Sequence, residues 1–321
     1  MKPLSLLLVA GLGLAACQSA PPPPVVAPPV IPEPTSPVSS TDVLQARLMS
    51  DVRVLAADSL EGRGAGTEGG AKARLYLEER FRGIGLEPMG EDGYRQLVPL
   101  QSGAEAVNLV GRIPGTVHPQ RVLVVTAHYD HLGVRRGEIY NGADDNASGV
   151  AALLDVARRF TEAPPKHTII FVAFDAEEQG LVGARHFVAN SPVPLGAILA
   201  TVNFDMVSRG DTGALWVAGT AHYPHLGDII ESVVASAPVT VRFGHDTGSG
   251  SDNWTSASDH GAFHQRDVPF LYFGVEDHAD YHRESDEVDK IDPVFFAGAA
   301  EAIWSAVHAL DEDHAALASG R

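Results

Sequence analysis

The chain has 321 residues, 45% of them hydrophobic, which is enough for one or two domains with a sizeable buried core. Its 41 Asp and Glu residues outnumber 23 Lys and Arg residues, and the resulting net charge of −18 repels phosphate backbones, so we expect no nucleic-acid partner. Cys17 is the one cysteine, which excludes an intramolecular disulfide.

Residues 1–17 have the features of a lipoprotein signal peptide. Lys2 supplies a positive charge, and the apolar run that follows it is too short to span a bilayer as a stable helix. The segment Leu14–Cys17 resembles the bacterial lipobox, in which the cysteine is lipidated and becomes the mature N-terminus. Because Gln18 rather than Asp follows, the resemblance implies an outer-membrane lipoprotein of the cell envelope that faces the periplasm. The alternative is an ordinary secretory signal cut near Ala16, which would give a secreted protein.

Residues 18–40 contain nine prolines and no helical or strand period. Such a tract is an extended, semi-rigid spacer, and at ~3.1 Å per residue it can hold a folded domain on the order of 70 Å from a lipid on Cys17. We therefore expect a tether over 18–40 and a single domain over 41–321.

The remaining chain alternates between apolar strands and amphipathic helices. The Gly-rich stretch 60–70 is expected to be a loop, because it lacks the Lys-Ser/Thr ending of a phosphate loop and follows no strand. Strands are expected within 94–112 and at 122–127, 167–174, 198–204, 215–218 and 268–275, and helices at 42–57, 71–84, 149–160, 181–190, 222–235 and 293–310. This order predicts an α/β fold with three layers, α/β/α, around a mostly parallel mixed sheet.

Polar side chains follow four of these strands at their carboxyl ends. His128 and Asp130 follow the first, Glu177 and Glu178 the second, and Asp205 the third, whereas the fourth leads through an acidic loop to Tyr281 and His282. Ligands of open α/β sheets gather outside the carboxyl ends of the strands, so these groups are expected to meet at one site. Asp144 and Asp145, in the turn before the helix at 149, are near enough in sequence to His128 to join them.

Imidazoles and carboxylates without thiolates suit Zn²⁺, with Mn²⁺ or Co²⁺ as alternatives. A single catalytic zinc needs three protein ligands, and the surplus here indicates two metal ions roughly 3.5–4 Å apart. Of two adjacent glutamates, one can bind metal while the other remains free as a general base.

The motifs AHYDHLG, NGADDNASGV, FDAEEQGLVGA, NFDM and DYHRESD, in that order, resemble those of the M28 family of zinc peptidases. LEGRGAGTEGG is similar to the family's N-terminal loop, so the resemblance covers about residues 42–310. The family includes bacterial aminopeptidases, glutamate carboxypeptidases and, more distantly, glutaminyl cyclases. The resemblance implies the zinc-peptidase (phosphorylase/hydrolase-like) architecture with two zinc ions.

The resemblance also implies roles for individual residues. His128 and Asp205 would bind one zinc, Glu178 and His282 the other, and Asp145 would bridge them, with a cis peptide between Asp145 and Asn146. Asp144 is the rival for the bridging position.

Glu177 matches the family's general base, and Asp130 matches the carboxylate that orients His128, with a plain loop residue as the alternative. Tyr281 is expected either to donate to the oxyanion or to pack. Asp259 and His260 match a family segment near the substrate cleft, whereas His131, His278 and His260 do not match ligand positions and are expected at the surface or in the cleft. Residues 244–260 are expected to form one wall of that cleft.

The resemblance implies peptide hydrolysis, most specifically by an aminopeptidase. A carboxypeptidase or dipeptidase would need a basic clamp, for which Arg266 and Arg283 are candidates, and a glutaminyl cyclase would use one zinc. A non-catalytic, tethered binding module would have lost ligands, but all five ligand positions and the base are filled. A serine hydrolase has no support, because the chain has no Gly-x-Ser-x-Gly motif.

Overall fold

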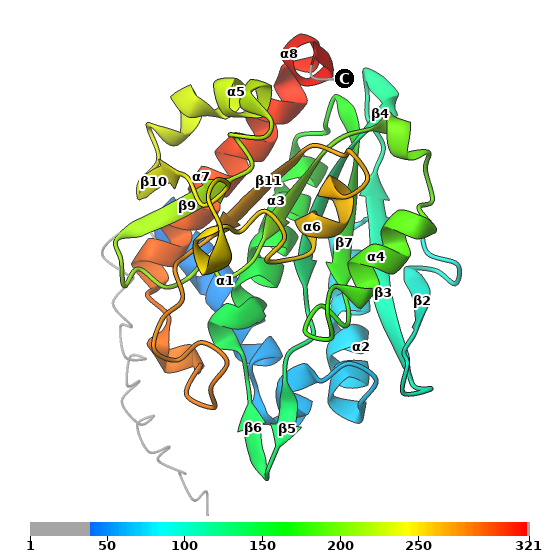
Figure 1. Ribbon diagram of the computed structural model, residues 1–321, viewed down its shortest axis with the longest axis vertical. Helices are drawn as coiled ribbons and strands as arrows, with labels where there is room; N and C mark the ends of the chain where they lie inside the picture. The colour runs from blue at the N-terminus through cyan, green and yellow to red at the C-terminus, as the bar shows by residue number, and fades with distance from the viewer. Residues whose placement is uncertain (1–38, 320–321) are drawn as a thin grey trace, which may run out of the picture. The chain divides into compact units, whose positions relative to one another are not determined.

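The computed structural model describes residues 39–319 (Figure 1). The predicted signal peptide with Cys17, and all of the predicted tether except its last two residues, lie outside the described residues.

Nine strands of the described chain form one mixed sheet. Its order is β1-β3-β7-β4-β8-β11-β9-β10, with β2 paired to β3, and the four central strands β7, β4, β8 and β11 are mutually parallel. The strands are β1 Glu87–Pro88, β2 Arg95–Pro99, β3 Glu105–Ile113, β4 His118–His128, β7 His167–Phe174, β8 Ile198–Phe204, β9 Ala214–Ala218, β10 Thr240–Phe243 and β11 Phe270–Gly274. The mixed sheet with a parallel centre confirms the predicted fold class.

Helices cover both faces of the sheet, because its central strands are apolar on both sides. In β7 every residue is buried, and alternate side chains enter different cores: Ile169 and Phe171 the larger one, Ile170 and Val172 the smaller one. The larger core is closed by α1 (Ser40–Leu55), α2 (Glu68–Ile84), α3 (Gly149–Glu162), α5 (Pro224–Val234) and α7 (Pro293–Glu312). The smaller core is closed by α4 (Val182–Ala189) and α6 (His260–His264), which Figure 1 shows together on the opposite face.

Short elements connect these layers. A hairpin, β5 (Gly133–Arg135) with β6 (Glu138–Tyr140), and a terminal helix, α8 (His314–Ser319), were not predicted, and neither was β10. The other short elements are 3-10 turns at Asp58–Arg63, Leu195–Ala197, Gly250–Asp252 and Val288–Lys290, and a π-helical turn at Ala143–Ser148. Helix α2 begins three residues earlier than expected because the Thr67 hydroxyl caps it by accepting a hydrogen bond from the amide of Gly70.

Within residues 39–319, α7 is the one helix whose length and hydropathy would also suit a membrane span. Of that apolar window, 61% is buried, and α7 contacts α1, α3 and α5. Its apolar character is therefore explained by its place in the larger core.

The parallel centre determines where functional groups meet. The carboxyl ends of β4, β7, β8 and β11 share one edge of the sheet, and His128, the Glu177–Glu178 turn, Asp205 and the 276–289 loop begin there. At the opposite edge β4 and β7 begin with His118 and His167, which are register partners.

Candidate metal centre

His128, the last residue of β4, is buried with its Nε2 directed at two carboxylates. Nε2 lies 3.2 Å from Asp205 Oδ1 and 3.4 Å from Asp145 Oδ1. Nδ1 lies 3.1 Å from the carbonyl oxygen of Asp130, and because a carbonyl only accepts, Nδ1 is the nitrogen that carries the proton. The tautomer therefore presents the lone pair of Nε2 to the carboxylate cluster, as a metal ligand requires.

A second group surrounds Glu178. Its Oε1 lies 2.7 Å from His131 Nδ1, and its Oε2 lies 3.3 Å from His282 Nε2. Asp145 Oδ2 lies 3.2 Å from His282 Nε2 and 3.7 Å from His131 Nδ1. Two histidines, the predicted His282 and the unpredicted His131, thus approach the same carboxylate pair.

Asp145 belongs to both groups. One group is His128, Asp145 and Asp205, the other is His131, Asp145 and Glu178, and within each the ligand atoms lie within 4.8 Å of one another. The expected cis peptide between Asp145 and Asn146 is present.

The carboxylate of Asp144, the rival bridge, is already used elsewhere. Its Oδ1 accepts from the amide and hydroxyl of Ser208, at 2.8 and 2.7 Å, and its Oδ2 accepts from His278 Nε2 at 3.2 Å. The geometry therefore favours Asp145 for the bridging position.

The donor set fits divalent metal ions. Imidazole nitrogens and carboxylate oxygens converge without a thiolate, which suits Zn²⁺, Mn²⁺ or Co²⁺. His131 Nδ1 and Glu178 Oε1 are buried and lie 2.7 Å apart as an ion pair that is not aligned as a hydrogen bond, and His131 Nε2 is buried without a hydrogen bond. Buried polar atoms without a well-aligned partner are rare in native proteins, and a bound metal ion would be a partner for Nδ1 and Oε1.

The expectation that His131, His278 and His260 lie at the surface or in the cleft is wrong. All three imidazoles are buried. His278 donates to Asp144, and His260 Nε2 donates to the carbonyl of Trp254 at 2.8 Å, whereas His131 joins the second ligand group. Burial lowers the pKa of His260 to about 4, so this ring is neutral and positions the Trp254 loop.

Asp130 organises the turn that carries both glutamates. Its Oδ1 accepts from the amide of Glu177 at 3.0 Å and its Oδ2 from the amide of Glu178 at 3.4 Å. Its carboxylate stands 3.8 Å from His128 Nδ1, so the orientation of that ring depends on the backbone carbonyl of Asp130 rather than on its carboxylate.

A cavity of about 420 Å³ opens beside both groups. It is lined by His128, Asp145, Glu177, Glu178, Asp205, His282 and Tyr281, together with Arg185, Trp254, Ser256, Ala257, Tyr272 and Asp277. Three of these residues come from 244–260, which confirms that this segment forms one wall. Arg266 and Arg283 are exposed outside the lining, so neither is the expected basic clamp, and Arg185 is the cation that the sequence analysis missed.

Burial raises the pKa of Glu177 well above its ordinary range, although His128 opposes the shift. A carboxylate that holds a proton more readily than usual suits a general base that later acts as an acid.

The three expected substrate contacts differ in position. Tyr281 lines the cavity, with its ring stacked on His282 at 3.9 Å between centroids. Asp259 and His260 are not among its lining residues; both are buried behind the Trp254 wall, because α6 turns back into the smaller core at this point. Neither carboxylate oxygen of Asp259 has a hydrogen bond, and burial raises the pKa of this group to about 7.

Two residues that the sequence analysis did not select hold the ligand-bearing turns. The buried Arg63 donates to the carbonyls of Leu55, Tyr129, Asn141 and Gly142. Burial lowers its pKa to about 10 despite the nearby Asp145, so it stays charged. Asp286 accepts from the amides of Asp144 and Asp145 at 3.1 and 3.0 Å. The sequence signal for Arg63 was its place as the single arginine in a Gly-rich loop. The signal for Asp286 was its place as the last residue of the DYHRESD motif.

Comparison with known proteins agrees with this architecture. The family model described as peptidase family M28 matches residues 108–307. This chain belongs to peptidase family M28. It is 28% identical to the aminopeptidase YwaD of Bacillus subtilis over 211 residues, covering 63% of this chain and 44% of that protein, and 28% identical to carboxypeptidase Q of Pongo abelii over 235 residues, covering 69% and 46%.

The chain thus spans less than half the length of these curated relatives. Among solved structures it is similar to BSAP, a zinc aminopeptidase from Bacillus subtilis, with a TM-score of 0.67, 17% identity, and coverage of 82% of this chain and 94% of that one. At 17% sequence identity this similarity shows a shared fold only.

Replacing Arg63 with Met is expected to lower the free energy of unfolding of the metal-loaded protein by about 3–5 kcal/mol, because four carbonyls lose their donor and Asp145 loses its electrostatic interaction with a buried cation. Urea unfolding in excess Zn²⁺ measures this. The matched control is Arg53→Met on the exposed side of α1, which should change the value by less than about 0.5 kcal/mol. A loss below 1 kcal/mol for Arg63→Met would contradict the assigned role.

Proposed function

We propose that this M28 protein is a zinc-dependent exopeptidase and, more specifically, an aminopeptidase. One observation carries the proposal. The two ligand groups share Asp145, and their members apart from His131 line the same cavity as the side chain of Glu177. The similarity to YwaD, named as an aminopeptidase, supports the direction of cleavage.

Two zinc ions would be held by His128, Asp145 and Asp205 on one side and by Asp145, Glu178 and His282 on the other, with His131 beside the second. When bound, they would supply Lewis-acid polarisation of the scissile carbonyl and favour ionisation of water at neutral pH. Glu177 takes the proton of the attacking water and returns it to the leaving amine. Asp130 keeps Glu177 in place by accepting from its amide. Tyr281, which lines the cavity, packs on His282 and is the candidate donor to the oxyanion.

The lining favours a substrate with a free amino terminus. Asp277 is an exposed residue in the cavity wall outside both ligand groups, and partial burial raises its pKa although His282 opposes the shift. An α-ammonium group would supply a cationic partner. Arg185 in the same lining favours the alternative, a carboxypeptidase or dipeptidase that binds a terminal carboxylate, and carboxypeptidase Q is among the relatives. A glutaminyl cyclase would use one zinc, whereas the two groups here fit two.

We further propose that the protein is anchored in the cell envelope by a lipid on Cys17 and faces the periplasm from the outer membrane. The support is the lipobox-like segment before Cys17 and the proline-rich stretch after it. The proline spacer would allow the peptidase domain to reach soluble peptides away from the membrane surface.

The variant Glu177→Gln is expected to bind zinc as the wild type does while kcat on an aminoacyl-p-nitroanilide falls by about 10²–10⁴-fold, because the amide cannot accept the proton of water. Metal analysis and single-turnover kinetics test this together. A variant with near wild-type kcat would refute the assignment of the base.

Asp277→Asn is expected to raise KM for peptides with a free amino terminus about tenfold or more, with a smaller effect on kcat, because a charge-assisted hydrogen bond contributes about 1.5–3 kcal/mol. The matched control is Glu284→Gln, an exposed residue of the same loop. A peptide library with free and blocked termini provides the substrates. Cleavage of peptides with blocked amino termini, combined with a large KM increase for Arg185→Ala, would instead support the carboxypeptidase alternative.

Cys17→Ala is expected to abolish incorporation of labelled palmitate in bacterial cells and to move the protein from the detergent phase to the aqueous phase of a Triton X-114 separation. Equal partitioning of the variant and the wild type would refute the lipid anchor. A secreted wild-type protein without label would support the secretory alternative.

A further inference from the structure

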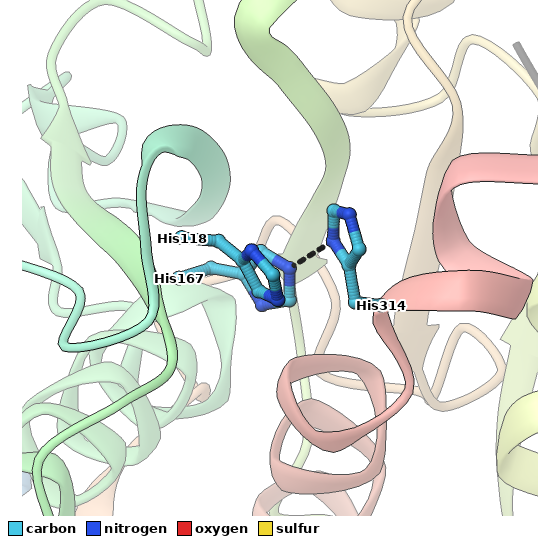
Figure 2. Close-up of side chains that lie close together, drawn as sticks. All are labelled: His118, His167 and His314. Atoms are coloured by element: carbon cyan, nitrogen blue, oxygen red, sulfur yellow. Dashed lines mark hydrogen bonds between the residues drawn. The ribbon is translucent and has the colours of Figure 1, made fainter.

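Three histidines lie together at the edge of the sheet opposite the M28 centre (Figure 2). His118 is the first residue of β4, His167 the first of β7, and His314 the first of α8. The His118 and His314 rings are stacked with centroids 3.8 Å apart, and the His167 ring stacks 5.0 and 5.1 Å from them. Ten residues of strand at about 3.3 Å each separate His118 from His128, so the two sites lie roughly 30 Å apart.

Asp311 fixes the tautomer of the central ring. Its Oδ1 accepts from His167 Nδ1 at 3.0 Å and from the His167 amide at 2.8 Å, and its Oδ2 accepts from the amide of Lys166 at 2.8 Å. Since Nδ1 of His167 donates to a carboxylate, its Nε2 carries the lone pair and accepts a hydrogen bond from His314 Nδ1 at 2.8 Å, which a bound ion would replace. A histidine that donates one ring nitrogen to a carboxylate and presents the other outward is the usual arrangement behind a metal-bound imidazole.

We propose that His118, His167 and His314 bind a transition-metal ion such as Zn²⁺, with Asp311 orienting His167. One ring nitrogen from each residue lies within 4.8 Å of the others, and a tetrahedral zinc with Zn–N bonds of about 2.0–2.1 Å needs nitrogens about 3.3 Å apart. Because the rings are stacked, they must turn toward a common point, and the broad χ2 torsion of histidine permits this. His118 and His314 are half-buried, so water can reach the fourth position.

The surrounding charges are compatible with a dication. Asp311 is a buried carboxylate directly behind His167, and the charge of Lys166 is paired with Glu312 at 2.8 Å. Arg121 is the opposing charge, and it acts on His314.

The ion would attach the C-terminal helix to the sheet. Helix α8 has six residues; Leu317 packs in the larger core, and the helix contacts α5, α7 and β8. Two ligands come from adjacent strands and one from α8, and a bound ion would therefore hold the helix against the starts of β4 and β7. The role is structural and does not depend on the proposed peptidase function.

Metal counting tests the proposal. The protein is equilibrated by dialysis with Zn²⁺ alone, and zinc per chain is then measured. His314→Ala and His118→Ala are each expected to hold one equivalent fewer than the wild type, and the matched control His186→Ala, on α4, should hold the same number. If the M28 centre held one zinc instead of two, the difference of one equivalent between the wild type and the cluster variants would remain. Failure of the proposed function would therefore be distinguished from failure of this proposal. Equal zinc content in the wild type and both cluster variants would overturn the proposal.

Hydrogen exchange provides a second readout that does not depend on metal at the M28 centre. Zn²⁺ is expected to slow amide exchange across residues 314–319 in the wild type and in His186→Ala, and to leave it unchanged in His118→Ala. Since His118 lies on β4, a loss of protection in α8 would show that the ion connects the two elements. Unchanged exchange in wild-type α8 on addition of Zn²⁺ would also overturn the proposal.

Discussion

The structure depends on a concentration of buried negative charge at one edge of the sheet. Asp130, Asp145, Glu178 and Asp205 are all held within a few ångströms of His128 or His131. The buried Arg63 guanidinium donates to backbone carbonyls and interacts electrostatically with Asp145, Asp130 and Glu178. Carboxylates removed from water at this density repel one another and lose hydration, at a cost of several kcal/mol each unless cations compensate them. Divalent metal ions supply the missing positive charge, so metal binding and folding of this edge are linked.

The ligands are positioned through the backbone more than through contacts between side chains. Arg63 donates to the carbonyls of Asn141 and Gly142. Asp286 accepts from the amides of the next turn, at Asp144 and Asp145, and Asp130 accepts from the amides of the two glutamates. Each of these residues holds the segment that carries a ligand without occupying the ligand position. A site supported in this way keeps its geometry when one ligand is replaced, because the backbone is fixed independently.

The fold and much of the site were predictable from sequence because both follow from simple periodicity. Apolar runs of strand length define β4, β7, β8 and β11, and parallel strands bring their carboxyl ends, with His128, Glu178 and Asp205, to one edge. Three features were not predictable in the same way: the burial of His131, the hydrogen bonds from Arg63 to the ligand-bearing turn, and the burial of the Asp259 carboxylate without a hydrogen bond. These depend on how the 58–67, 129–142 and 244–260 segments fold over the edge, and no period in the sequence encodes that. Strand β10 and helix α8 were missed because they are short and their positions come from packing.

The two candidate metal sites lie at opposite ends of the same strands, and nothing in those strands couples them. Strands β4 and β7 begin in the histidine cluster and end in the M28 centre; β7 is buried throughout, and β4 is buried from Val122 to His128. Coupling between distant sites requires an element with two discrete arrangements whose balance both sites influence. The parallel pairing of β4 with β7 continues without irregularity from Val122 to His128, and the register shifts only between His118 and Val122, next to the cluster. This shift separates His118 from the regularly paired part of β4, so the proposed ion would attach α8 to the start of the strand without a direct contact to His128.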